Sequence, residues 1–505
     1  MTMNKLTKII ALSSLPFLTV GAFATDTDSD GIDDRIDNCV SVANEDQLDT
    51  DGDRIGDECE TSEANKKSVA NVYNRYFGNG FTLETGAERL GYTFAQPVLT
   101  FIPGYGVDSD SDGILDGYKP VLILSAGYDP TKDYIGTYNS SLNGALNQSD
   151  ITGVTGSTPD SSGNRKNDSL GNAIYFVDAT TGATVATIEG QTTRADGSDA
   201  PTVETDSLNL VSGLSHGIAA SVTPIDADGD GLTERIYFAD VVGNIWRADL
   251  DLTLDEGSNM YELKVQNWRV YKFAALGVDG VSANYAANDR RIFNQIDVVR
   301  TVKDGVVYDA LLVGTGNVAN PAETSVNDMF FMVKDYRTSN FSTYTSGDYP
   351  LDLTDLENVS SAVASSQDSK DGWYIDFTDS GEKVVSGSVT IDGSVYFTTI
   401  VPQTKSGCAA PATLPTNYFY SVNVHSAAPV VASTSSESDM ANVSLRRSVI
   451  SGEGLVLQQI DPYIASSGAV TVVGLDGIKD ADLGKKTDQG KVLKGGGSYW
   501  RTEDQ

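Results

Sequence analysis

Short runs of apolar and β-branched residues, separated by polar turns that contain Asp and Gly, extend through most of this chain. The runs either alternate apolar and polar positions or are apolar throughout, and this pattern predicts half-buried and buried β-strands rather than helices. The pattern is clearest in residues 121–129, 172–188, 235–250, 308–317, 328–336 and 389–402.

Two of these segments contain similar hairpins and indicate a degenerate internal repeat. IYFVDATTG (174–182) and IYFADVVGN (236–244) have Tyr and Asp at matching positions, followed by a glycine turn. Repeated four-stranded sheets around an axis protect their edges, and at roughly 50–60 residues per sheet this length accommodates about seven of them. We therefore predict an all-β fold, a β-propeller of about seven blades. A pair of stacked sandwiches is the alternative.

The first residues of the chain have the pattern of a secretory leader. Lys5 and Lys8 precede an apolar run over 9–20, and Ala22-Phe23-Ala24 provides a cleavage site after Ala24. We predict a signal peptide over 1–24, and no later stretch reaches the roughly 18 apolar residues that a membrane helix needs. A net charge of −35 argues against nucleic acid as a partner, because its phosphates would be repelled.

Two acidic loops follow this leader. In each, carboxylates occupy positions 1, 3, 5, 9 and 12 of a Ca²⁺ loop and an isoleucine carbonyl occupies position 7. Residues 25–60 hold 14 Asp or Glu against two Arg, so the segment is expected to need a hard cation to become ordered; a solvated acidic tether without a specific ion is the alternative. The predicted ligands are Asp26, Asp28, Asp30, Ile32, Asp34 and Asp37, then Asp49, Asp51, Asp53, Ile55, Asp57 and Glu60.

Two further loops of this kind lie within the predicted propeller. Both place aspartates at positions 1, 3 and 5, but neither has a carboxylate at position 12, so another ligand or water must complete the shell. An Asp/Gly-rich turn whose carboxylates accept backbone N–H groups is the alternative. The predicted ligands are Asp108, Asp110, Asp112, Ile114 and Asp116 in one loop, and Asp226, Asp228, Asp230, Leu232 and Glu234 in the other.

The first two loops and their cysteines resemble a pair of thrombospondin type 3 repeats over residues 26–60, through DxDxDGxxDxxDNC and NxDQxDxDGDxxGDxC. Such repeats wrap the chain around Ca²⁺ without a hydrophobic core. The resemblance implies a disulfide between Cys39 and Cys59, and Asn44 and Asp46 as additional ligands. Cys408 is then left as a buried thiol or as a link to another chain.

The remainder resembles the C-terminal propeller of the PilC/PilY proteins of type IV pili. An ordered series carries the resemblance, and its most specific part is IDADGDGLTERIYFADVVGNIWRADL (225–250), which joins an acidic loop, a strand and a GNxWRxDL hairpin. The family implies a modified, quinoprotein-like propeller that binds Ca²⁺. It usually carries a long N-terminal region, whereas here only the acidic segment and a short connector precede the propeller.

Two enzyme-like patterns occur in the sequence, and both are incomplete. Residues 213–217 match GxSxG with Ser215 as nucleophile, but the chain beyond continues as β rather than as the helix of a nucleophile elbow, and His425 is the only other histidine for a triad. The turn with Tyr175, Asp178 and Gly182 resembles those of quinoprotein dehydrogenases, yet the recurrent tryptophans and cysteine pair of those enzymes are missing. We expect no enzyme activity.

The sequence therefore predicts a signal peptide (1–24), thrombospondin type 3-like Ca²⁺ repeats (25–60), a partly helical connector (61–94) and a PilC/PilY-like propeller (95–505). The expected function is Ca²⁺-dependent type IV pilus assembly or pilus-tip adhesion, at the cell surface or secreted by way of the periplasm. Expected partners are minor pilins or other filament subunits and a host or surface receptor. The alternatives are a Ca²⁺-dependent matrix or filament protein unrelated to pili, and a quinoprotein-type oxidoreductase.

Overall fold

The computed structural model forms two compact units, Met1–Thr82 and Leu83–Gln505. The boundary between them falls inside the predicted connector. Within these units the structure describes residues 43, 89–109, 115–129, 168, 170–191, 205, 207–250, 263–277, 285–338, 349–364, 370–402, 415–430, 441–450, 461–464, 470–473, 494–496 and 499–501. Apart from Ala43, the acidic segment 26–60 lies outside these residues, as do all three cysteines and residues 61–88 of the predicted connector.

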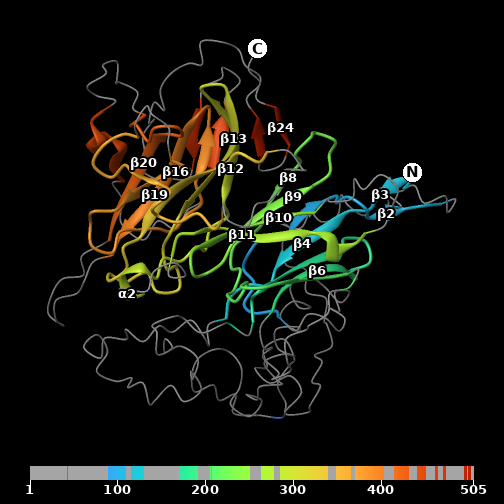
Figure 1. The fold of residues 1–505 in the computed structure, drawn as a ribbon. Coiled ribbons are helices and arrows are strands. Elements are labelled where there is room, and N and C mark those ends of the chain that lie inside the picture. The colour runs from blue at the N-terminus through green and yellow to red at the C-terminus, as the bar shows by residue number, and fades with distance from the viewer. Residues whose placement is uncertain are drawn as a thin grey trace, which may run out of the picture. The chain divides into compact units, whose positions relative to one another are not determined.

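The described part of the second unit is built almost entirely of β-strands, which confirms the predicted all-β class (Figure 1). Four larger sheets follow one another along the chain. The first contains β1(Val98–Thr100), β4(Val121–Ser125), β5(Ala173–Asp178), β6(Thr184–Gly190) and β7(Leu208–Val211). The second contains β8(Thr223–Ile225), β9(Arg235–Ala239), β10(Asn244–Asp249) and β11(Arg269–Ala275).

The third and fourth sheets contain most of the other described strands. The third contains β12(Asp297–Lys303), β13(Val306–Gly314), β14(Met329–Asp335), β15(Glu357–Asn358), β16(Gly372–Asp376), β24(Lys494–Gly496) and β25(Tyr499–Arg501). The fourth contains β17(Lys383–Val384), β18(Val389–Ile391), β19(Ser394–Val401), β20(Thr416–Asn423) and β21(Arg447–Ile450). Two hairpins stand apart, β2(Gly106–Val107) with β3(Gly117–Tyr118) and β22(Asp461–Ile464) with β23(Val470–Val473).

Helices are few among the described residues. There is one α-helix, α2(Tyr285–Asn288), and two 3₁₀ turns, η2(Val265–Asn267) and η4(Val443–Arg446). In this part of the chain no helix has the length and apolar character needed to span a membrane. All six segments singled out for their apolar pattern contain strands of the four sheets.

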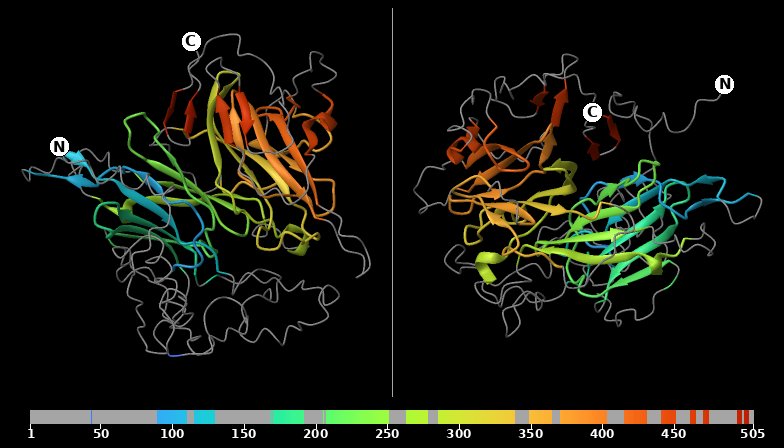
Figure 2. Two further views of the ribbon diagram at one scale, coloured as in Figure 1. Left: turned by 180° about the vertical axis from the view of Figure 1, so that it is seen from behind. Right: turned by 45° about the horizontal axis from the view of Figure 1, so that its top comes forward.

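Apolar side chains fill the spaces between successive sheets, because the strands are apolar on both faces. Phe176 packs edge-to-face on Trp268 at 4.8 Å between the first and second sheets. Phe273 and Tyr349 lie 5.0 Å apart in the core between the second and third. Phe330 stacks on the Phe397 ring at 3.8 Å between the third and fourth. Figure 2 shows the same progression, with the colour changing from sheet to sheet.

The repeated hairpins are held by equivalent aspartates. Asp178 Oδ1, at the end of β5, accepts the N–H groups of Thr180 and Thr181 at 2.7 and 2.8 Å. Asp240 Oδ1, after β9, accepts the N–H groups of Val242 and Asn244 at 3.1 and 3.0 Å. The two turns therefore share one hydrogen-bonding design, as the degenerate repeat predicts.

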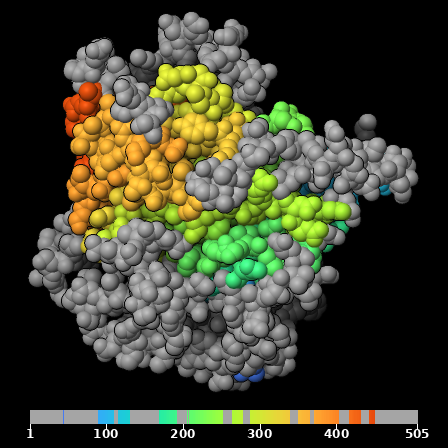
Figure 3. All heavy atoms as spheres, in the orientation of Figure 1, coloured from blue at the N-terminus to red at the C-terminus, as the bar shows by residue number. Residues whose placement is uncertain are grey.

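Most of the described strand pairs are antiparallel, with one parallel pair in the first sheet, β6 with β7, and two in the third. β25 pairs in parallel with β12 and brings the C-terminal strand into that sheet, and β15 pairs in parallel with β16. Side chains of the third and fourth sheets, coloured yellow to orange, form one continuous area on the face seen in Figure 3. A total of about seven blades stays a prediction.

Candidate metal centre

The acidic loop between β8 and β9 gathers four carboxylates in the described part of the chain. It begins after Ile225, where β8 ends, and finishes where β9 begins at Arg235. Gly229 and Gly231 have φ values of +89° and +94°, which residues with a Cβ atom rarely adopt. These two glycines let the chain turn tightly enough for aspartates at alternate positions to point inward.

Oxygen atoms of Asp226, Asp228, Asp230 and Glu234 all lie within 4.8 Å of one another. The structure therefore brings together the four side chains that the sequence predicted as ligands of this loop. The donor set is all oxygen, with no nitrogen or sulfur, and this chemistry suits a hard cation such as Ca²⁺.

An Asp/Gly-rich turn without a metal ion, the alternative to a Ca²⁺ site, would explain part of this geometry. Asp226 accepts the N–H groups of Gly229 at 2.6 Å and Gly231 at 3.0 Å. Asp228 accepts the N–H of Asp230 at 3.1 Å, and Asp230 accepts that of Leu232 at 2.8 Å. These bonds shape the loop, but they involve only the three aspartates and give no reason for a fourth carboxylate.

Glu234 is the residue that a simple turn does not explain. Its side chain is 3% exposed. Its Oε2 accepts the Ala227 N–H at 2.7 Å, whereas its buried Oε1 has no hydrogen-bond partner. A buried carboxylate oxygen without a partner is costly, and a cation in the cluster would remove that cost.

The electrostatic environment of Glu234 also favours a cation in the cluster. The pKa of Glu234 is raised to about 8, mainly by burial; the hydrogen bond from Ala227 acts in the opposite direction, and the negative charges of Asp230, Asp226 and Asp228 contribute to the rise. Four like-charged groups this close repel one another unless a cation or proton lies between them. The residues therefore fit the Ca²⁺ that the sequence pattern implies.

Neighbouring sheets hold the loop from both sides. At its C-terminal end, the Thr233 N–H donates to the Phe101 carbonyl at 2.8 Å, and the Thr233 and Thr100 hydroxyls lie 2.6 Å apart, which ties the loop to the edge of the first sheet. Near its N-terminal end, Nη1 of Arg300 on β12 donates to the Ala227 carbonyl at 3.0 Å. The loop thus contacts the first and third sheets as well as its own.

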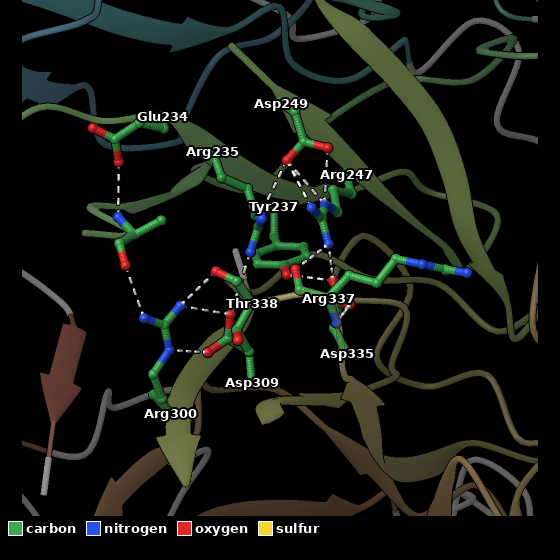
Figure 4. A network of polar contacts seen from close by, with 11 residues as sticks. Glu234, Arg235, Tyr237, Arg247, Asp249, Arg300, Asp309, Asp335, Arg337 and Thr338 are labelled. Carbon is green, nitrogen blue, oxygen red and sulfur yellow. Dashed lines mark hydrogen bonds and ion pairs between the residues drawn. The ribbon is translucent and has the colours of Figure 1, made fainter. Parts of the chain in front are cut away.

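Arg300 belongs to a buried network of ion pairs between arginine and aspartate side chains, which Figure 4 shows. Arg300 pairs with Asp309 at 2.9 Å, and Asp309 lies 3.4 Å from Arg235. Asp249 joins Arg235 to Arg247, at 2.9 Å from each, and Arg247 reaches Asp335 at 2.5 Å. The sequence patterns did not predict this network. Its signal was a set of charged residues inside otherwise apolar strands.

The predicted loop at 108–116 is described only at its ends, where it joins β2 to β3. Asp116 Oδ2 accepts the Ser109 N–H at 2.7 Å, and hydrogen bonds from the Ser109 side chain and from this N–H lower the pKa of Asp116. Asp110, Asp112 and Ile114 lie outside the described residues, as do all the predicted ligands between Asp26 and Glu60. Ca²⁺ binding at these places stays a prediction.

The structure also describes the residues of the two enzyme-like patterns. After Ser215 the chain runs through an isolated bridge at Ile218 to β8 without a helix. His425 contacts the Tyr308 hydroxyl at 2.7 Å. Tyr175 is fully buried, and Asp178 shapes its turn as described above.

Comparison with known proteins does not establish a family for this chain. The chain matches no protein-family model and no curated protein. Among solved structures it is similar to the C-terminal domain of PilY1 from Pseudomonas aeruginosa, with 16% identity, 77% of this chain and 72% of that chain covered, and a TM-score of 0.47. A match at this level does not establish a shared fold.

Proposed function

We propose that this protein is an exported Ca²⁺-binding β-protein that acts in type IV pilus assembly or in adhesion at the pilus tip. The observation that carries the metal assignment is the convergence of Asp226, Asp228, Asp230 and the buried Glu234, whose Oε1 has no protein partner. The pilus assignment is supported by the ordered sequence resemblance to the PilC/PilY propeller.

Within the loop, each part has a distinct task. The three aspartates supply oxygen ligands held by backbone N–H groups, Glu234 supplies a carboxylate from the start of β9, and the Leu232 carbonyl is the expected fifth protein ligand. When bound, Ca²⁺ neutralises the mutual repulsion of these groups and fixes the backbone between β8 and β9. The acidic loops over 26–60 and 108–116 would be ordered in the same way.

The consequence for the whole protein is a surface whose rigidity depends on Ca²⁺. Loops that are fixed only when metal is present bias a protein toward one binding-competent form. We propose that this form binds minor pilins or other filament subunits, or a receptor on another surface. A matrix or filament protein unrelated to pili would use the same metal chemistry and is the second candidate.

The metal assignment is tested by calorimetric titration of the full chain with Ca²⁺ after treatment with a chelator. We expect binding by the wild type and loss of part of the binding heat in Asp228→Ala. The matched control is Asp304→Asn, at an exposed position in the turn between β12 and β13. Absence of binding by the wild type, or equal binding by Asp228→Ala, would refute the assignment.

The pilus assignment needs a separate experiment in cells. The protein should be found at the cell surface or on filaments and should co-purify with minor pilins when the pilus machinery is intact. In cells without that machinery its surface location should be lost. An unchanged location in those cells would favour the matrix protein.

A further inference from the structure

The backbone of Ala227 connects the acidic loop to the third sheet. Its N–H donates to Glu234 Oε2 at 2.7 Å, and its carbonyl accepts from Arg300 Nη1 at 3.0 Å. Two consecutive peptide groups, joined at the Ala227 Cα atom, therefore contact a candidate metal ligand and a cation from another sheet.

Arg300 is itself held in a fixed orientation. Its Nε donates to Asp309 Oδ1 at 2.9 Å, and its Nη2 donates to Asp309 Oδ2 at 3.3 Å and to the Thr338 carbonyl at 3.3 Å. The Arg300 side chain is 15% exposed and that of Asp309 is fully buried. A planar guanidinium paired twice with one carboxylate has little freedom to rotate, so the direction of Nη1 is set by the third sheet.

We propose that Arg300 is a positioning residue for the metal centre: it holds the backbone at Ala227, whose N–H in turn orients Glu234 toward the three aspartates. This inference rests on the proposed Ca²⁺ binding at residues 226–234. Since coupling between two parts of a protein is reciprocal, Ca²⁺ at the loop also strengthens the junction between the second and third sheets.

The charge of Arg300 by itself would predict the opposite change in Ca²⁺ affinity, so the proposal can be tested. Removing a positive group near four carboxylates would, by Coulomb's law, favour a cation. However, Asp309 already balances the charge of Arg300 in a close pair. Loss of orientation is therefore expected to outweigh loss of repulsion, and Arg300→Met should bind Ca²⁺ less tightly.

The experiment is hydrogen exchange of the full chain, followed by mass spectrometry at a series of free Ca²⁺ concentrations. Peptides covering 225–235 report this loop separately from other acidic loops, and peptides covering β12 report the junction. The variants are Arg300→Met and Arg300→Lys. The control is Arg447→Met, which removes an arginine that pairs with Glu382 and Asp379 in and near the fourth sheet.

In the wild type and in Arg447→Met, Ca²⁺ should slow exchange in both the loop and β12. In Arg300→Met the Ca²⁺ needed to protect the loop should rise about 10-fold, and the Ca²⁺-dependent protection of β12 should disappear. Arg300→Lys keeps the charge but not the planar fork, so it should also weaken binding; should Arg300→Met not fold, this variant decides the question.

Three results are distinguishable. If Ca²⁺ does not protect the loop even in the wild type, the proposed metal site fails, and the positioning role with it. If it protects the loop equally in the wild type and in the Arg300 variants, or better in the variants, the metal site stands and the positioning role is wrong. If Arg447→Met weakens protection as much as the Arg300 variants do, the effect is one of general stability and the proposal is also overturned.

Discussion

The hydroxyl of Tyr237 on β9 donates to the carboxylate of Asp335 on β14 at 2.6 Å, and both side chains are completely buried. Burial raises the pKa of Tyr237 well above its usual value of 10.0, so the hydroxyl keeps its proton and remains a donor. The contact joins the second sheet to the third through polar atoms in an otherwise apolar core. It lies in the same ion network that reaches the acidic loop through Arg300.

Asp309 is the point in this network where loss of one group should be most damaging. Replacing it with alanine leaves both Arg235 and Arg300 without this carboxylate, and breaking a buried ion pair costs roughly 3–5 kcal/mol. We expect Asp309→Ala to lower the free energy of unfolding in urea by about this amount. Asp304→Asn, in the turn of the same hairpin, should change it by less than about 0.5 kcal/mol, and similar losses in both variants would contradict a special role for Asp309.

Glu234 should matter for the metal and not for the metal-free fold. Glu234→Gln keeps the shape of the side chain but cannot form the carboxylate that would bind a cation beside the three aspartates. Even changes outside a ligand shell reduce metal affinity about 10–100-fold, so loss of a carboxylate ligand should reduce it at least about 10-fold. Without Ca²⁺ the variant should be as stable as the wild type or more stable.

The measurement for Glu234 is calorimetric titration together with thermal unfolding in chelator. Glu357→Gln, on the partly exposed strand β15, is the matched control. A Glu234→Gln variant that binds Ca²⁺ like the wild type but unfolds more easily would mean that Glu234 is a structural residue only.

Asp328 should make stability depend on pH. Burial raises its pKa from 3.8 to about 7, although Lys383 and the hydrogen bond from Thr315 act in the opposite direction. The folded state therefore retains a proton that the unfolded state has lost between about pH 4 and pH 7, and stability from this group falls as the pH rises through that range. The decrease is at most about 1.4 kcal/mol per pH unit.

Urea titrations across this pH range test the assignment. In Asp328→Asn the slope of stability against pH should become less negative than in the wild type, whereas Asp392→Asn, at an exposed turn position, should leave it unchanged. A slope that is the same in all three proteins would exclude Asp328 as its source.

Gly190 should be intolerant of any side chain. A Cβ atom there would lie 1.8 Å from the carbonyl oxygen of Leu214, which belongs to the backbone and cannot rotate away. Overpacking of this kind costs roughly 1–3 kcal/mol, so Gly190→Ala should lower the free energy of unfolding by at least that amount. Gly387 has no atom within 4 Å of the same position, and Gly387→Ala should be neutral or slightly stabilising. Equal effects in chemical denaturation would show that the close approach at Gly190 relaxes easily.

Much of the fold could be predicted because each strand has a recognisable pattern of apolar and polar residues. Apolar runs such as 172–188 and 235–250 form hairpins almost at the predicted positions, since residues buried on both faces must be apolar and the turns require Asp and Gly. The acidic loop could be predicted for a similar reason, because its ligands lie within nine consecutive positions, Asp226 to Glu234. Local geometry was enough to gather them.

The ion network could not be predicted in this way. Arg235, Arg300 and Asp335 come from three different strands in two sheets, and nothing in the chain between them indicates that they meet. A charged residue in a strand is usually placed on the solvent side, and only the packing of one sheet on the next turns these charges inward.

By itself, then, the sequence determined the β class, the positions of the hairpins and the composition of the acidic loop, all of which depend on contacts between near neighbours. The tertiary structure alone decided that Glu234 is buried with an unpartnered oxygen and that Arg300, from β12, holds the loop at Ala227. Burial and the meeting of distant charges depend on which sheets pack together, and that information is spread over the whole chain rather than carried by any one segment.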